Sequence, residues 1–149
     1  MAKFLVVLAV VCIVGAVAVR GEFDKKEAQA KLKARAGECK TEVGATEADI
    51  KELMEMKPAS TKEGKCLRAC LMQKYEVMDA SGKFVTSVAL KHAEKATNGS
   101  ADKMKLALEI INACASTQVS SDLCQAAEDY GKCFKQQATA HGIDDNYQF

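Results

Sequence analysis

The chain has 149 residues, is 48% hydrophobic with no tryptophan, and carries 21 basic against 20 acidic residues. This balance of charge argues against a nucleic-acid partner, which would require a basic face, and no run of like charges predicts an electrostatic membrane patch. The length suits one domain and is too short for two once a leader is removed.

Residues 1–21 have the pattern of a secretory signal peptide. Lys3 precedes an uninterrupted run of 16 apolar or small residues, which is short for a membrane span and lacks a stop-transfer flank. We therefore prefer a signal peptide cut after Ala18 or Gly21 to the alternative of an uncleaved membrane anchor. The mature protein, residues 22–149, is then secreted and extracellular.

The mature chain is predicted to be all-α, with about six helices. Thr46 is a predicted N-cap followed by acidic residues that favour a helix start, and residues 79–82 have a turn composition. The apolar spacing from Val85 to Ala96 marks one continuous helix face that includes His92. Helices are expected over residues 24–41, 47–54, 62–78, 85–96 and 101–117, with a last helix capped by Ser120 or Ser121 that runs to Cys133 and precedes a tail, 134–149.

The helix expected over residues 101–117 is predicted to be the most buried. Its polar residues form one narrow stripe, Lys105, Glu109, Asn112 and Ser116. A helix that is apolar on most of its circumference belongs at the centre of a domain.

The sequence Asn98-Gly99-Ser100 has two interpretations. It is formally an N-glycosylation sequon in a secreted chain. It equally suits a helix-ending Asn-Gly turn followed by a Ser cap, and we favour the turn.

The cysteines predict a disulfide framework. Cys12 leaves with the signal peptide, so seven cysteines become six: Cys39, Cys66, Cys70, Cys114, Cys124 and Cys133. An even set in a secreted chain indicates disulfides, and the paired spacing of zinc ligands is absent. We therefore predict no metal and no cofactor.

Helix geometry narrows the pairing without fixing it. Cys66 and Cys70 lie four residues apart with parallel side chains, and Cys124 and Cys133 lie nine apart and half a turn out of phase. Neither pair should bond within a regular helix. Of the roughly 15 pairings of six cysteines, about ten survive.

The cysteine spacing resembles a known signature. The six cysteines are separated by 26, 3, 43, 9 and 8 residues. This resembles the six-cysteine class of insect odorant-binding proteins, the pheromone-binding and general odorant-binding family, whose most constant intervals are three residues between the second and third cysteines and eight between the fifth and sixth. The resemblance covers essentially the whole mature chain.

The resemblance implies a pairing, a fold and a function. The family pairing carried over gives Cys39–Cys70, Cys66–Cys124 and Cys114–Cys133. It also implies about six helices around an internal apolar cavity, and a soluble extracellular carrier that delivers odorants, pheromones or similar hydrophobic ligands to receptors. The expected partners are the small hydrophobic ligand and a membrane receptor or a second copy in a homodimer. The alternative is a secreted or gland-fluid protein that uses the same scaffold to bind another protein or a non-odorant lipid.

Candidate ligand-binding residues come from the apolar faces of the later helices and the tail, since ligand cavities are mostly apolar. They are Leu71, Tyr75, Met78, Phe84, Val88, Leu106, Ile110, Ile111, Tyr130, Phe134, Ile143 and Phe149. His92 and His141 are candidate pH switches; the tail is expected to cover the pocket mouth, and His141, with Asp144 and Asp145, to fasten or release it. The chain has no G-x-S-x-G or H-E-x-x-H motif, and we predict no enzyme and no catalytic residue.

Overall fold

The computed structural model describes residues 24–143, and within that range the protein is all-helical, as predicted. The predicted signal peptide lies outside the described residues and stays a prediction. No helix among residues 24–143 is long and apolar enough to cross a membrane. The helices are α2 (Lys25–Val43), α3 (Glu47–Met54), α4 (Lys62–Lys74), α5 (Thr86–Ala96), α6 (Ala101–Ala115) and α7 (Leu123–Ala140).

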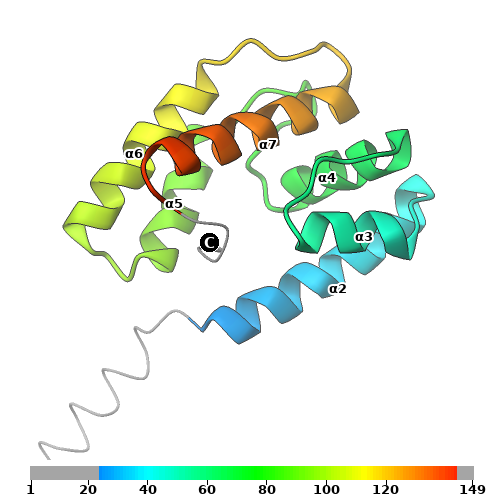
Figure 1. Cartoon of the computed structure of the whole chain (residues 1–149), viewed down its shortest axis with the longest axis horizontal. Helices are drawn as coiled ribbons and strands as arrows, with labels where there is room; N and C mark the ends of the chain where they lie inside the picture. The colour runs from blue at the N-terminus through cyan, green and yellow to red at the C-terminus, as the bar shows by residue number, and fades with distance from the viewer. Residues whose placement is uncertain (1–23, 144–149) are drawn as a thin grey trace, which may run out of the picture.

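The helices form two groups joined by α7. Figure 1 shows α2, α3 and α4 packed together at one end of the molecule and α5 with α6 at the other. Helix α7 crosses both groups and packs against α4 and α6. Among the helices of residues 24–143, α5 packs only against α6.

The helix ends follow capping rules. The Asp24 carboxylate accepts the first free N–H groups of α2, and Gly44 ends that helix with a left-handed φ of 72°. The Thr46 hydroxyl and the Asp49 carboxylate form a capping box at α3, as the predicted cap requires. Thr61 caps α4 by accepting the Gly64 N–H at 2.9 Å.

Asp49 also ties α3 to α4. Its buried carboxylate accepts hydrogen bonds from the Thr46 N–H at 2.7 Å and the Thr61 hydroxyl at 2.5 Å. The bond from Thr61, and then that from Thr46, lowers the pKa of Asp49 below its usual value. The stability that these bonds contribute is therefore present at neutral pH and is lost as the pH falls through the lowered pKa.

The most buried helix is α4, and the prediction that this would be the helix over 101–117 is wrong. Only Lys62 and Glu63 of α4 are exposed, because α2, α3 and α7 all pack against this helix. Helix α6 packs against α5 and α7 alone, and Leu108 on its outer side is 42% exposed. The apolar circumference of α6 is therefore only partly covered.

Helix α4 ends at Lys74, four residues before the predicted end at Met78. Glu76 adopts a left-handed φ of 60°, which stops the helix. The chain then turns so that Met78 forms an isolated antiparallel bridge with Phe84 and is only 2% exposed. The intervening turn is confirmed, with the Asp79 carboxylate accepting the N–H groups of Ser81 and Lys83.

The boundaries near α6 and α7 differ slightly from the prediction. Asp122, rather than Ser120 or Ser121, caps α7 by accepting the Gln125 N–H at 2.8 Å. Helix α7 continues to Ala140, so the first part of the predicted tail is helical. Before α6, Asn98 and Gly99 form the favoured turn with φ values of 52° and 70°, although the Ser100 hydroxyl makes no capping bond.

The disulfides have the pairing that the resemblance implies. Cys39–Cys70 joins α2 to α4, Cys66–Cys124 joins α4 to α7, and Cys114–Cys133 joins α6 to α7. Each bridge typically stabilises a fold by about 2–4 kcal/mol. Neither α3 nor α5 contains a bridged cysteine.

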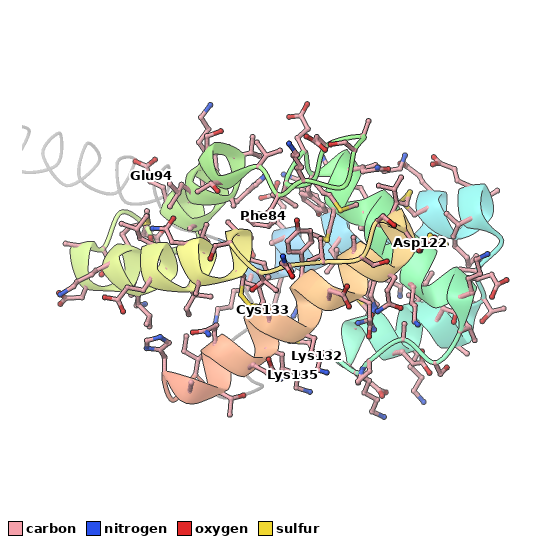
Figure 2. All side chains as sticks on the ribbon, turned by 90° about the horizontal axis from the view of Figure 1, so that it is seen from above. Phe84, Glu94, Asp122, Lys132, Cys133 and Lys135 are labelled. Carbon is pink, nitrogen blue, oxygen red and sulfur yellow. A yellow bond between two sulfur atoms is a disulfide. The ribbon has the colours of Figure 1, made fainter. Side chains whose placement is uncertain are left out.

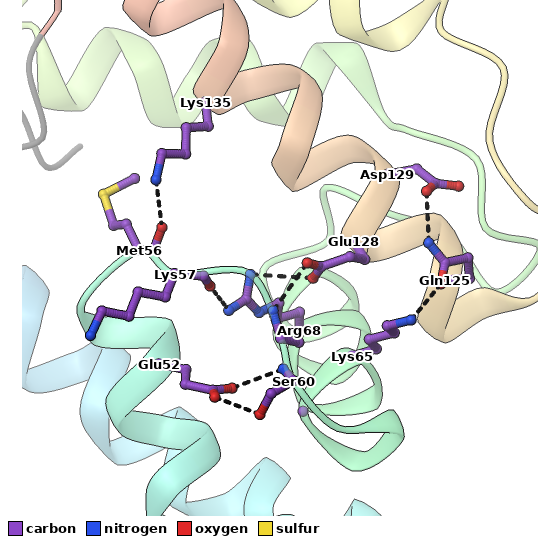
Figure 3. Close-up of polar contacts among 12 residues, drawn as sticks. Glu52, Met56, Lys57, Ser60, Lys65, Arg68, Gln125, Glu128, Asp129 and Lys135 are labelled. Atoms are coloured by element: carbon purple, nitrogen blue, oxygen red, sulfur yellow. Dashed lines mark hydrogen bonds and ion pairs between the residues drawn. The ribbon is translucent and has the colours of Figure 1, made fainter.

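Polar contacts hold the α3–α4 linker against α7 (Figure 3). Arg68 of α4 pairs with Glu128 of α7 at 3.3 Å, with both side chains 15% exposed, and also donates to the Lys57 carbonyl. Glu128 accepts the Ala59 N–H at 3.1 Å, and Lys135 donates to a linker carbonyl. A half-buried ion pair with these extra hydrogen bonds fixes orientation more than it adds stability.

Gly64 lies where α3 approaches α4 closely, so a larger side chain at this position should destabilise the protein. A Cβ on Gly64 would lie 2.9 Å from Asp49 Oδ1 and 3.1 Å from the Thr61 hydroxyl. We expect Gly64→Ala to lower the free energy of unfolding in urea by about 1–3 kcal/mol, because the capping network must shift.

Gly131 in α7 is the matched control, since a Cβ there meets no atom within 4 Å. Gly131→Ala should raise the free energy of unfolding by about 0.4–1 kcal/mol. Equal effects at the two glycines would contradict this account of the α3–α4 contact.

Candidate functional site

Most of the buried apolar residues fall into three clusters, and several of the predicted ligand-binding residues belong to these clusters or pack against them. The α2–α4 core is Ala36, Cys39, Ile50, Leu67 and Leu71. The α4–α7 core is Ala69, Met78, Ala126, Ala127 and Tyr130. The α5–α6 core is Ala89, Ala93, Ala107 and Ile111.

Two phenylalanines join the α4–α7 core to the α5–α6 core. Phe84 and Phe134 pack against both, and their ring centroids lie 5.4 Å apart. Phe84 also lies 5.4 Å from the Tyr130 ring, and the Tyr130 hydroxyl donates to the Gly82 carbonyl at 3.1 Å. Figure 2 shows Phe84 near the middle of the molecule, whereas Glu94 of α5 lies at its edge. These aromatic rings set the spacing between α7 and the α5–α6 pair.

The structure brings together five of the predicted residues. They are Met78, Phe84, Ile111, Tyr130 and Phe134, which belong to or bridge the two joined cores. Leu71 instead lies in the α2–α4 core with Tyr75 packed against it. Ile110 is 2% exposed, whereas Val88, Leu106 and Ile143 are half-buried and outside the three cores. Phe149 lies outside the described residues.

Tyr75 is the point at which α2, α4 and α5 meet through side chains. The Arg35 guanidinium carbon lies 4.3 Å from the Tyr75 ring centroid. On the α5 side, the His92 ring packs against the Tyr75 ring at 5.8 Å, and His92 Nε2 lies 3.1 Å from the Tyr75 carbonyl oxygen. His92 is exposed, and His141 is an exposed C-cap residue of α7.

Arg35 is not among the residues predicted from the sequence to form the site. A signal was present, because Leu32, Ala36 and Cys39 have helical spacing and Arg35 falls on the same side of α2. A charged residue beside that apolar face indicated either a buried ion pair or a polar contact at a pocket edge.

Two shallow hollows lie at the surface of residues 24–143. One is lined by Lys91, Glu94, Lys95, Asn98 and Gly99. The other is lined by Gln73, Glu76, Met78, Asp79, Ala80 and Val85. Neither is the enclosed apolar cavity that the resemblance implies. The grouping of Cys39, Glu42 and Cys70 is no thiolate metal site, because both sulfurs are bonded in the disulfide.

The helical fold and the disulfide pairing are consistent with the protein family whose model matches the chain. The model of the PBP/GOBP family, the pheromone-binding and general odorant-binding proteins, matches residues 22–137. The chain belongs to this family. It is 46% identical to general odorant-binding protein 28a of Drosophila melanogaster over 138 residues, which covers 93% of this chain and 96% of that protein. General odorant-binding protein 19d of the same species is 36% identical, with 73% of each chain covered.

Solved structures show the same fold for this odorant-binding protein. Drosophila melanogaster odorant-binding protein 28a superposes with a TM-score of 0.73 at 47% identity, covering 81% of this chain and 100% of that one. A fatty acid binding protein, OBP56a, from the oral disk of the blowfly Phormia regina gives 0.63 at 19% identity, covering 80% and 97%. Apis mellifera odorant binding protein 5 gives 0.66 at 16% identity, covering 78% and 93%. The last two likenesses concern the fold alone.

The contact of Tyr130 with the 79–82 turn gives a prediction. Tyr130→Phe should lower the free energy of unfolding in urea by about 1 kcal/mol, because the Gly82 carbonyl loses its buried donor. Tyr75→Phe is the matched control, since the Tyr75 hydroxyl makes no hydrogen bond within residues 24–143. A larger loss for Tyr75→Phe than for Tyr130→Phe would contradict the assigned roles.

Proposed function

We propose that this odorant-binding protein is a secreted carrier that holds a small hydrophobic molecule in an internal apolar site and delivers it to a membrane receptor. Family membership supports the carrier function, and the relatives are binding proteins rather than enzymes. The signal peptide predicted over residues 1–21 supports secretion. The location of the site and the delivery step are the proposed parts.

The observation that carries the location is the isolation of α5. Within residues 24–143 this helix packs on α6 alone, so side chains rather than helix contacts close the space toward α2 and α4. Val88 on α5 is half-buried but belongs to none of the three cores. A half-buried apolar side chain outside the cores suits the lining of a space that a ligand fills.

We place the ligand between α5 and the α2–α4 group. Tyr75, at the end of α4, and Val88, on α5, would line opposite sides of this space. Phe134, which is half-buried in α7, would line it from the α7 side. The remaining predicted residues, among them Leu106 and Ile143, stay candidates for the lining.

Displacement of a fluorescent apolar probe, N-phenyl-1-naphthylamine, tests the proposal. Long-chain alcohols or esters should displace the bound probe at micromolar concentrations. If no apolar compound displaces a probe and no probe binds, the carrier function is wrong, and the alternative of a secreted protein that acts on another protein gains support.

A space-filling variant tests the location. Val88→Trp should weaken probe binding by at least about tenfold, because the indole occupies the ligand space. Leu108→Trp is the matched control, since Leu108 is 42% exposed on the outer side of α6, and it should leave binding unchanged. Equal binding by both variants would contradict the location, whereas the thermal midpoints establish that both fold.

We further propose that protonation of histidine weakens ligand binding. His92 contacts Tyr75, and His141 ends α7 within the tail that is predicted to cover the pocket mouth. Imidazole changes charge in the range from about pH 7 to about pH 5. Affinity for 1-dodecanol should fall across this range, and His141→Ala or His92→Ala should flatten the fall. An unchanged profile in both variants would exclude a histidine switch.

A further inference from the structure

Arg35 is a cation without an anionic partner among residues 24–143. Its side chain is half-buried, and within residues 24–143 it makes no ion pair and no hydrogen bond. Two other nearby cations are paired: Lys31 lies 2.6 Å from Glu27, and Lys74 lies 2.8 Å from Glu42. Arg35, which contacts the Tyr75 ring, has no such partner among residues 24–143 and can pair with another anion.

The contact with Tyr75 leaves the hydrogen-bonding groups of Arg35 available. A cation–π contact is an attraction between the charge and the ring face, and it requires no hydrogen-bond acceptor. The five N–H donors of the guanidinium therefore remain without an acceptor among residues 24–143. They form a fork that fits the two oxygens of a carboxylate.

The residues around Tyr75 are arranged for an amphiphile. Leu32 lies one turn from Arg35 on α2, and Val88 lies one turn from His92 on α5, and all four are half-buried or exposed rather than sealed in a core. Leu32 packs against the same core as Tyr75, and Val88 lies one helical turn before His92, which contacts the Tyr75 ring. A ligand with an apolar chain and an anionic head satisfies both kinds of surface at once.

We propose that Arg35 binds the carboxylate of a long-chain fatty acid, with the guanidinium held at the face of the Tyr75 ring and the acyl chain lying against Leu32 and Val88. The proposal rests on the carrier function above and names its ligand class. A neutral alcohol or ester of the same length fills the same apolar surface but offers the guanidinium no charge-assisted pair of hydrogen bonds. The site should therefore favour the acid over its neutral analogues.

Competition against N-phenyl-1-naphthylamine at neutral pH tests the assignment, with dodecanoate, 1-dodecanol and methyl dodecanoate as the competing ligands. Dodecanoate should bind more tightly than the two neutral compounds. Arg35→Gln should weaken dodecanoate by about 10- to 100-fold, the loss expected for a hydrogen bond to a charged group. The same variant should change 1-dodecanol by less than about twofold, because the apolar contacts remain.

Lys33→Gln is the matched control. It removes the same charge from the same helix at an exposed position two residues away, and it should leave dodecanoate binding unchanged. Arg35→Lys keeps the charge but loses the planar fork, so it should fall between the native protein and Arg35→Gln. If Arg35→Gln does not fold, weaker binding of dodecanoate by Arg35→Lys, with binding of 1-dodecanol unchanged, still supports the carboxylate site.

The outcomes distinguish a failure of the carboxylate site from a failure of the carrier function. Equal binding of the acid and the alcohol, or an equal loss for both in Arg35→Gln, overturns the carboxylate site and leaves the carrier function intact. Weakening by Lys33→Gln as large as that by Arg35→Gln shows a diffuse charge effect and also overturns the site. Failure of all three compounds to displace the probe overturns both proposals.

Discussion

The fold depends on the joining of α4 to α7. The Cys66–Cys124 bridge brings the two backbones to a Cα–Cα distance of 4.3 Å. Arg68, two residues after Cys66, and Glu128, four residues after Cys124, form a half-buried ion pair close to it. Because α4 also carries α2 and α3, and α7 also carries α6, this one helix pair fixes the relation between both ends of the molecule. Every other element is placed through it.

The α2–α3–α4 group is held together more strongly than the α5–α6 pair. Helix α2 is bridged to α4 and α6 to α7, and α3, which has no bridge, is held by the buried Asp49 carboxylate. Within residues 24–143, helix α5 has no bridge, and its core meets the α4–α7 core through Phe84 and Phe134, which pack on both. Elements with few buried contacts open at low free-energy cost. The structure thus concentrates its freedom to move beside the proposed ligand space.

The sequence predicted the helices well because their signals are local. Caps such as Thr46 and the apolar spacing of each helix depend on neighbours in the chain. The end of α4 depends on the pairing of Met78 with Phe84, and the burial of α4 rather than α6 depends on which helices cover it. Periodicity shows that a helix has an apolar face but not what packs there. The disulfide pairing came from the family resemblance, since helix geometry left about ten patterns open.

The candidate site was only partly predictable from the sequence, because its residues meet through tertiary contacts. The apolar lining was foreseeable in type, but Arg35 and Tyr75 meet through tertiary contacts that no spacing encodes. Tyr75 belongs to the α2–α4 group and yet touches His92 of α5. A ligand held between them would connect α5 to α2, where no helix contact among residues 24–143 does so. Binding to the folded state alone stabilises that state, so the weakest junction of the protein is the one that its cargo would reinforce.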